Sequence, residues 1–187
     1  MKFEDWLADR TAEAAAELLG KLKAGGFHIS FAESCTGGLL SGAFTAQAGA
    51  SEAYAEGFVT YANRAKEELL AVPGELLARL GAVSAPVAAA MALGAGRRSG
   101  AELALAVTGI AGPGGGSPQK PVGLVYIGAA WGDTVWVLRR RFAGSRQLVR
   151  AQTVLAALEL GLLVLDNLDN LDNLENKENP ENLPNRK

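Results

Sequence analysis

The chain has 187 residues, of which 49% are hydrophobic and 20% charged, so it suits one globular domain with a sizeable core. Its formal net charge of -2 argues against a surface built for nucleic acid or anionic membranes, and its single cysteine, Cys35, excludes an internal disulfide. Acidic residues occupy the N-terminus where a signal peptide would be apolar, and the apolar stretch 154–165 is shorter than the roughly 20 residues that span a bilayer. We therefore expect a soluble, cytoplasmic protein.

The spacing of apolar residues and the turn residues predict strands alternating with helices, followed by an antiparallel pair of strands. In chain order the predicted elements are a helix (4–24), a strand (28–31), a helix (37–46), a strand (56–61), three helices (64–71, 73–80 and 84–98), a strand (103–107), two strands joined at Gly132-Asp133 (122–131 and 134–142) and a closing helix (146–165). This order predicts an α/β fold: a single three-layer α/β/α domain over residues 1–165, with a mixed, mostly parallel sheet.

Residues 166–187 differ in composition from the rest of the chain. Asparagine recurs at every third position from Asn167 to Asn185, a period that matches neither a helix nor a strand, and six acids stand against three bases. We therefore expect a low-complexity, disordered tail without an assigned function. The alternative is that Leu168, Leu171 and Leu174 extend the closing helix by a turn or two.

Two polar loops follow predicted buried strands, at residues 32–38 (Ala-Glu-Ser-Cys-Thr-Gly-Gly) and 107–116 (Val-Thr-Gly-Ile-Ala-Gly-Pro-Gly-Gly-Gly). Both loops are expected at one end of the sheet, where ligands of open α/β sheets bind. Ser34 lies where a strand gives way to a glycine-bearing helix start, which exposes a hydroxyl beside backbone N–H donors. Its position fits a nucleophile, and it also fits an N-cap serine that only satisfies helix amides.

A serine nucleophile needs a base, and the single histidine does not supply one within the same subunit. His28 lies six residues before Ser34 on the same strand, about 20 Å away at roughly 3.3 Å per residue. Lys66 follows the next strand and falls at the same sheet edge, where partial burial would lower its pKa enough for base catalysis. The alternative is a solvated lysine on a charged helix face. Glu33 fits two roles: it either orients Lys66 or caps the helix locally.

Other candidate groups are less well supported by the sequence. Cys35 is a competing nucleophile, but a side chain adjacent to Ser34 is expected to point into the core instead. The glycine-rich loop lacks a Walker A lysine and a dinucleotide fingerprint, so a bound ATP or NAD cofactor is not predicted, and acidic residues do not cluster into a metal site. Arg146, near the start of the closing helix, is the preferred phosphate ligand, with Arg141 and Arg150 left open.

These motifs closely resemble the CinA C-terminal-domain family, whose active members are nicotinamide-nucleotide amidases. The resemblance extends over about residues 3–165, and its matching blocks are residues 32–39, 61–66, 81–84, 107–116 and 120–123. Larger proteins of the family carry an N-terminal domain that this sequence lacks, so the resemblance implies a stand-alone amidase. It implies hydrolysis of nicotinamide mononucleotide to nicotinate mononucleotide and ammonia, without a metal or organic cofactor, by a protein that commonly forms homo-oligomers.

On this resemblance Ser34 attacks the amide carbonyl and Lys66 removes its proton, while Tyr61 and Thr108 position Lys66, the carboxamide or the hydrolytic water. The resemblance assigns the oxyanion to the backbone amides around Thr36 and Gly37, and the phosphate and ribose to Arg146 and the loop from Gly109 to Gly116. The substrate-binding residues are therefore expected to be Thr36, Gly37, Gly38, Gly109, Gly112, Gly114 and Arg146. Two alternatives remain: a protein-interaction module linked to competence or DNA damage, and a nucleotide-binding module without catalysis. The absence of a basic stripe argues against direct nucleic-acid binding.

Overall fold

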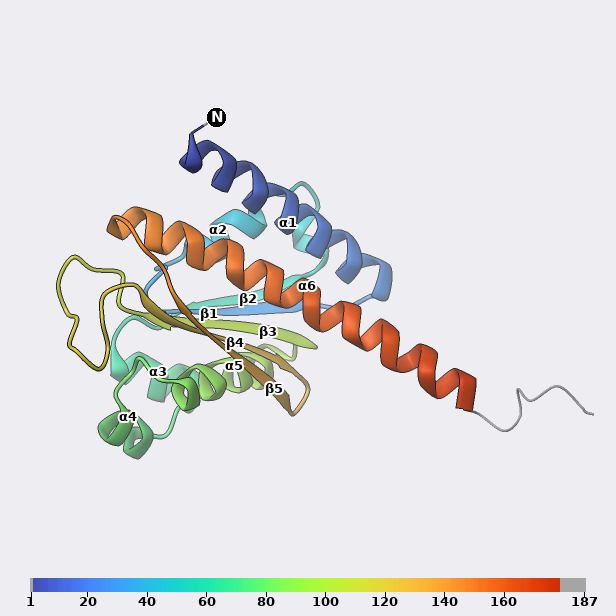
Figure 1. Cartoon of the computed structure of the whole chain (residues 1–187). Helices are drawn as coiled ribbons and strands as arrows, with labels where there is room; N and C mark the ends of the chain where they lie inside the picture. The colour runs from blue at the N-terminus through green and yellow to red at the C-terminus, as the bar shows by residue number, and fades with distance from the viewer. Residues whose placement is uncertain (1, 179–187) are drawn as a thin grey trace, which may run out of the picture.

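A five-stranded sheet lies between two layers of helices (Figure 1). The computed structural model describes residues 2–178, with residues 169–178 described by their backbone alone. The strands are β1 (Ile29–Glu33), β2 (Tyr54–Val59), β3 (Leu103–Gly109), β4 (Leu124–Trp131) and β5 (Thr134–Arg141). The helices are α1 (Phe3–Gly25), α2 (Leu39–Thr45), the 3-10 turn η1 (Ala50–Glu52), α3 (Asn63–Leu70), α4 (Gly74–Leu80), α5 (Ala85–Ser99) and α6 (Arg146–Glu178).

The order of strands in the sheet is β2-β1-β3-β4-β5. β1 pairs in parallel with both β2 and β3, whereas β4 runs antiparallel to its neighbours β3 and β5. Four of the five strands therefore run in the same direction. The predicted α/β fold with a mixed sheet is confirmed, and so is the hairpin that turns at Gly132 and Asp133.

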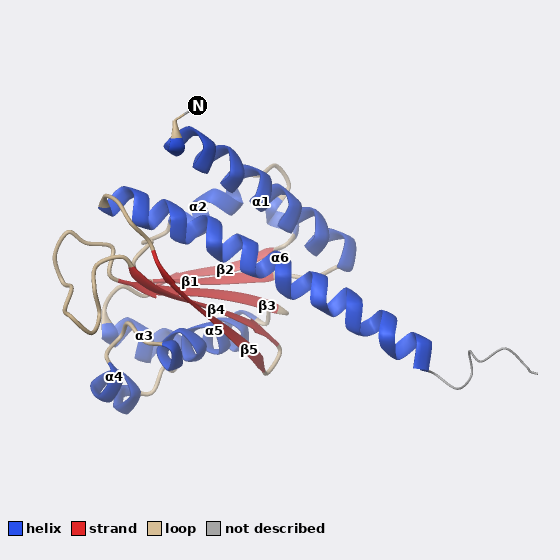
Figure 2. Cartoon of the chain, viewed as in Figure 1, coloured by secondary structure: helices blue, strands red, loops and turns tan. Residues whose placement is uncertain are grey.

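Helices α1, α2 and α6 cover one face of the sheet, and α3, α4 and α5 cover the other (Figure 2). On β1 and β3 the large side chains, such as Phe31 and Leu105, join the core under α1 and α6. Small side chains alternate with them and face α5, which therefore packs close to the sheet. At Gly128 of β4, an added Cβ would lie 2.6 Å from the carbonyl oxygen of Ala88, so this position requires glycine.

Helix α6 is longer than the sequence predicts. It continues past residue 165 to Glu178, and just beyond the predicted end Asp166 pairs with Lys21 of α1 at 2.6 Å and Leu168 packs against the core. The helix over residues 166–178 agrees with the alternative that the closing helix extends, and the last part of the predicted tail, residues 179–187, lies outside the described residues. Within residues 2–178, the segment Arg146–Leu168 has the length and apolar composition to cross a membrane, but most of it is buried against the rest of the fold.

The parallel strands bring the predicted loops to one edge of the sheet. Glu33, the last residue of β1, lies opposite Val59 of β2 and Val107 of β3. The pairing continues beyond the strands: the Ser34 N–H donates to the Val107 carbonyl at 3.0 Å, and the Thr60 N–H donates to the Glu33 carbonyl at 2.8 Å. The residues that follow β1, β2 and β3 therefore lie side by side. Figure 1 shows the glycine-rich loop after β3 and the start of α6 at this same end of the sheet.

Candidate active site

The structure brings Ser34 and Lys66 together at the carboxyl edge of the sheet. The Lys66 Nζ lies 3.2 Å from the Ser34 Oγ, although the two residues are 32 positions apart in the sequence. Lys66 reaches the serine from the first turn of α3, and its side chain is fully buried at 0% exposure, whereas Ser34 is 9% exposed. The alternative of a solvated lysine on a charged helix face is therefore wrong.

Two backbone carbonyls complete the surroundings of the lysine amine. The Lys66 Nζ donates to the Thr60 carbonyl at 2.7 Å and to the Tyr61 carbonyl at 3.2 Å. Burial lowers the pKa of Lys66 from its ordinary value of 10.5, because an ammonium ion loses its hydration there. No ion pair of Lys66 with a carboxylate is found among the described residues. A neutral amine would direct its two N–H bonds to the carbonyls and its lone pair to the Ser34 hydroxyl.

The role of Glu33, which the sequence left open, is to cap α2. Its fully buried carboxylate accepts hydrogen bonds from the backbone N–H groups of Gly38, Leu40 and Ser41 at 2.8–3.1 Å, and from the Ser41 hydroxyl at 2.7 Å. The donors at the start of α2 therefore satisfy this buried charge without a cation. Because Glu33 fills the cap, the interpretation of Ser34 as an N-cap serine is excluded; the N-cap residue itself is Gly38.

Cys35, the competing nucleophile, belongs to the core beneath α1 and α6. Burial raises the pKa of its thiol to about 12, so almost none of it is thiolate near neutral pH. The alternating direction of consecutive side chains at the end of β1 sends Ser34 toward Lys66 and Cys35 into the core. Of the two adjacent nucleophilic side chains, Ser34 alone is next to a base.

The turn between Ser34 and α2 contains three predicted substrate-binding residues: Thr36, Gly37 and Gly38. The Gly38 N–H already donates to Glu33 at 2.9 Å, whereas the N–H groups of Thr36 and Gly37 have no partner among the described residues. The carbonyls of Cys35 and Thr36 accept hydrogen bonds from Arg150 Nε at 3.1 Å and Nη2 at 2.7 Å, respectively. Arg150 thus contacts the backbone next to the nucleophile.

Tyr61 and Arg146 form a second group beside the dyad. The Tyr61 carbonyl holds Lys66, while its ring is 60% exposed and its hydroxyl accepts a hydrogen bond from Arg146 Nη2 at 3.3 Å. Arg146 Nη1 donates to the Gly112 carbonyl at 3.0 Å, which ties the glycine-rich loop to the start of α6. Arg141, the third arginine considered for phosphate, is exposed at the end of β5.

The remaining predicted residues lie on or near β3. Thr108 is fully buried, and its hydroxyl donates to the Ala82 carbonyl at 2.9 Å, so it fixes the segment before α5. Gly109 lets β3 approach β4, because an added Cβ would lie 2.7 Å from a methyl group of Val125. Gly114 has open space around it at the tip of the loop. His28 lies before β1, next to Glu102, at the opposite end of the strand from Ser34.

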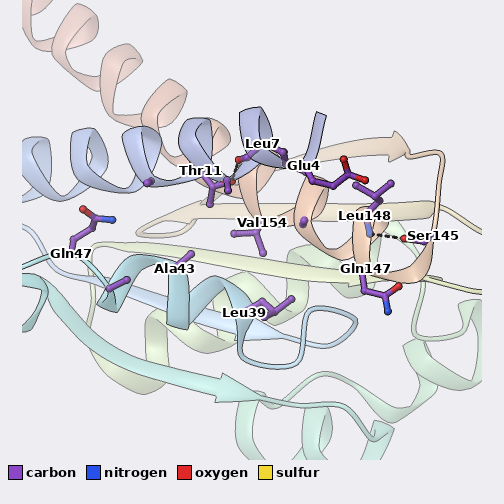
Figure 3. Close-up of a pocket in the computed structure, with 14 residues that line it drawn as sticks. Glu4, Leu7, Thr11, Leu39, Ala43, Gln47, Ser145, Gln147, Leu148 and Val154 are labelled. Carbon is purple, nitrogen blue, oxygen red and sulfur yellow. Dashed lines mark hydrogen bonds between the residues drawn. The ribbon is translucent and has the colours of Figure 1, made fainter. Parts of the chain in front are cut away.

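Two features of the described residues bear on what the dyad can bind: metal-ligating side chains and an apolar groove. Within the described residues, no group of three or more His, Cys, Asp or Glu side chains is arranged to hold a metal ion. An apolar groove of about 490 Å³ lies between α1, α2 and α6 and is lined by Leu7, Leu39, Leu148 and Val154, among others (Figure 3). Ser34 and Lys66 do not line it.

The sequence of this chain is similar to that of known proteins. The family model for the CinA C-terminal domain matches residues 11–165. The chain belongs to the CinA C-terminal domain family. The expected resemblance is therefore confirmed, and it includes both polar loops, α3 and the start of α6.

Individual relatives of this family differ in length. The chain is 46% identical over 154 residues to the nicotinamide-nucleotide amidohydrolase PncC of Enterobacter agglomerans, covering 82% of this chain and 94% of that protein. It is 52% identical over 151 residues to a CinA-like protein of Geobacter sulfurreducens, covering 81% of this chain and 36% of that protein, so it spans about a third of this longer relative. The crystal structure of the competence/damage inducible protein CihA from Agrobacterium tumefaciens superposes with a TM-score of 0.81 at 45% identity, covering 84% of this chain and 96% of that one.

Sequence reasoning missed two features of the site: the contact of Arg150 with the turn and the carbonyl of Thr60 as a partner of Lys66. The second follows from β-sheet register, since Thr60 continues β2 beside Ser34. The first joins residues more than 110 positions apart, and only the arginine's place near the start of the last helix pointed toward it.

Proposed function

We propose that this chain is a serine–lysine amidohydrolase that converts nicotinamide mononucleotide and water to nicotinate mononucleotide and ammonia, a reaction of pyridine-nucleotide salvage. The observation that carries the proposal is the 3.2 Å contact between the buried Lys66 amine and the Ser34 hydroxyl. The similarity to a protein named nicotinamide-nucleotide amidohydrolase over 94% of that protein's length supports the choice of substrate.

In the first step the neutral Lys66 amine takes the Ser34 proton as the Ser34 Oγ attacks the carboxamide carbon. The new O–C bond forms while one electron pair of the C=O bond moves onto the oxygen, giving a tetrahedral oxyanion. The Thr60 and Tyr61 carbonyls support this role, because they occupy two N–H bonds of the amine and leave its third position facing Ser34. General-base help of this kind contributes about 10²–10⁴-fold to the rate.

In the second step the oxyanion collapses and the C–N bond breaks. The leaving nitrogen takes the proton from Lys66 and departs as ammonia, leaving nicotinate mononucleotide as an ester of Ser34. A water molecule then gives its proton to Lys66 and attacks the ester carbon. The Ser34 Oγ regains that proton as it leaves, so the enzyme returns to its starting state. These steps use the chain's own side chains and need no cofactor.

The substrate-binding part of the proposal rests on Arg146 and the glycine-rich loop. The guanidinium of Arg146 lies between the Gly112 carbonyl and the Tyr61 hydroxyl, at the start of α6, where helix N–H groups favour an anion. We assign the phosphate to Arg146 and the ribose to the loop, including Gly109, Gly112 and Gly114. The exposed ring of Tyr61 would lie beside the positively charged pyridinium ring, which aromatic faces attract.

The proposal also includes a cytoplasmic location, a homo-oligomeric state, a small-molecule substrate and no nucleic-acid partner. The near-neutral charge of the chain and its single buried thiol support the cytoplasmic location and the lack of a nucleic-acid partner. The similarity to a nicotinamide-nucleotide amidohydrolase supports the small-molecule substrate. The homo-oligomeric state rests on the family resemblance. Light scattering coupled to gel filtration of the purified chain measures the oligomeric state, and a monomer would contradict that assignment.

Ammonia release from nicotinamide mononucleotide by the purified chain tests the proposed function. Wild type is expected to be active, whereas Ser34→Ala and Lys66→Met are expected to be folded and inactive. Matched controls are Ser99→Ala and Lys23→Met, which remove a serine and a lysine far from the dyad. An active Ser34→Ala variant would refute the serine mechanism. An inactive, folded wild type would refute the amidase and leave nucleotide binding or protein interaction.

A further inference from the structure

Arg150 holds two successive carbonyls of the turn that follows the nucleophile. Its Nε donates to Cys35 at 3.1 Å and its Nη2 donates to Thr36 at 2.7 Å, from a position on α6 114–115 residues away in the sequence. A planar guanidinium presents its N–H groups in a fixed fork, so two bonds to neighbouring carbonyls fix both peptide planes. Arg150, which lies on α6, thereby orients the turn.

The orientation of these carbonyls determines where the next two N–H groups point. In a trans peptide unit the C=O and N–H bonds point in opposite directions. Because the carbonyls of Cys35 and Thr36 face Arg150, the N–H groups of Thr36 and Gly37 point away from it. Neither N–H has a partner within the described part of the chain.

Three other N–H groups of the same segment are already used. Ser34 donates to the Val107 carbonyl at 3.0 Å, Gly38 donates to Glu33 at 2.9 Å, and the Leu39 N–H contacts the Thr36 carbonyl at 3.3 Å. The N–H groups of Thr36 and Gly37, on the second and third residues after the nucleophile, are thus left for an oxygen outside the protein. The Cys35 N–H before them likewise has no acceptor on another described residue, but Arg150 does not hold its peptide unit. Glu33 holds the far side of the same turn, and Gly37 supplies the positive φ of 58° that the turn requires.

We propose that Arg150 is a positioning residue that holds the Thr36 and Gly37 N–H groups as an oxyanion hole for the tetrahedral intermediate formed at Ser34. This inference rests on the proposed acyl transfer at Ser34. It assigns Arg150 to the turn and leaves the phosphate to Arg146. The guanidinium acts through the backbone and does not touch the substrate.

Kinetics of Arg150→Ala and Arg150→Lys test this role, with Arg97→Ala as the matched surface-arginine control. We expect kcat to fall about 10²–10³-fold, the cost of losing an oxyanion donor, with KM little changed. The fold-loss is expected to be equal for nicotinamide mononucleotide and for nicotinamide riboside, which lacks the phosphate. Added guanidinium ion is expected to restore part of the kcat of Arg150→Ala. A rise in KM confined to the mononucleotide, with kcat retained, would overturn the proposal and assign Arg150 to the phosphate.

A second readout separates this inference from the proposed substrate. An alkyl fluorophosphonate labels an activated serine: the Oγ–P bond forms, the P–F bond breaks, fluoride leaves and the serine proton passes to Lys66. Mass spectrometry of the Ser34 peptide gives the labelling rate without any mononucleotide. Labelled wild type without ammonia release would refute the proposed substrate only, and slower labelling of the Arg150 variants would still support the inference.

Equal labelling rates in wild type and the Arg150 variants would overturn the inference, and so would a wild type that is not labelled at Ser34. Circular dichroism and thermal unfolding establish that each variant is folded. Arg150→Lys keeps the charge and most of the side-chain length but not the fork, so the same comparison is made on it if Arg150→Ala does not fold.

Discussion

The pH dependence of turnover tests whether Lys66 acts as a neutral amine. An amine with a proton already bound cannot take one from Ser34, so activity requires the deprotonated form. Burial lowers the pKa of Lys66 below its ordinary value of 10.5, and no carboxylate among the described residues pairs with it to counter this effect. We therefore expect kcat/KM to rise with pH and to level off below pH 10.5.

The size of the effect follows from the titration of one group. Below the pKa of Lys66 in the free enzyme, the neutral fraction falls about tenfold for each pH unit, so kcat/KM is expected to fall by the same factor. In Lys66→Arg the guanidinium stays protonated throughout this range. This variant is expected to lose about 10²–10⁴-fold in kcat/KM and to lose the rising limb of the profile.

The same pKa shift has a consequence for stability with a defined sign. The unfolded chain binds the Lys66 proton at higher pH than the folded chain, so the free energy of unfolding rises with pH between the folded-state pKa and 10.5. The slope is at most about 1.4 kcal/mol per pH unit, and it is absent in Lys66→Met. The difference between wild type and Lys66→Met is therefore expected to shift in favour of wild type as the pH rises.

The assay is initial-rate ammonia release across the pH range, with urea unfolding of wild type and Lys66→Met at matched pH values. Lys23→Met is the control for removal of an exposed lysine and is expected to keep the wild-type profile. A flat wild-type profile, or a rising limb that survives in Lys66→Arg, would refute the assignment of Lys66 as the base.

Three further predictions address the residues around the dyad. Cys35→Ala is expected to keep nearly full activity, and the buried wild-type thiol, with its pKa of about 12, is expected to resist iodoacetamide at pH 8; loss of activity would implicate the thiol. Arg146→Ala is expected to raise KM for nicotinamide mononucleotide about tenfold to hundredfold, the equivalent of a charge-assisted hydrogen bond, while leaving KM for nicotinamide riboside unchanged. Equal effects on both substrates would contradict the phosphate assignment. Glu33→Gln is expected to lower the free energy of unfolding by about 1–3 kcal/mol, because the new NH₂ group faces buried backbone donors; urea unfolding with an unchanged midpoint would contradict this.

The sheet edge that carries the dyad was predictable from the sequence because parallel strands have one carboxyl edge. Ser34 and Thr108 follow short apolar runs, and Tyr61 ends the predicted strand 56–61. That pattern alone places the three residues close together. Because no histidine lies near Ser34 in the sequence, Lys66 was the candidate base. These inferences depend on local patterns of a few residues, which a sequence records directly.

Contacts made across the fold were not predictable in the same way. The packing of α2 and α6 on the sheet determines which buried donors surround Glu33 and which carbonyls Arg150 contacts. The continuation of α6 remained only an alternative for a similar reason: the segment after residue 165 is a poor helix former by composition, and the contacts that Asp166 and Leu168 make with the body of the fold cannot be read from the sequence.

The hydrogen bonds from Arg150 to the turn after Ser34 also determine when the site is complete during synthesis of the chain. The ribosome makes Ser34 and Lys66 early, but the guanidinium that orients the turn follows more than 80 residues after Lys66. A nascent chain or an N-terminal fragment therefore holds both members of the dyad without the arrangement that we assign to the oxyanion. On the proposed function, full hydrolytic activity therefore requires the finished chain, and recovery of that activity after refolding would report that α6 has docked.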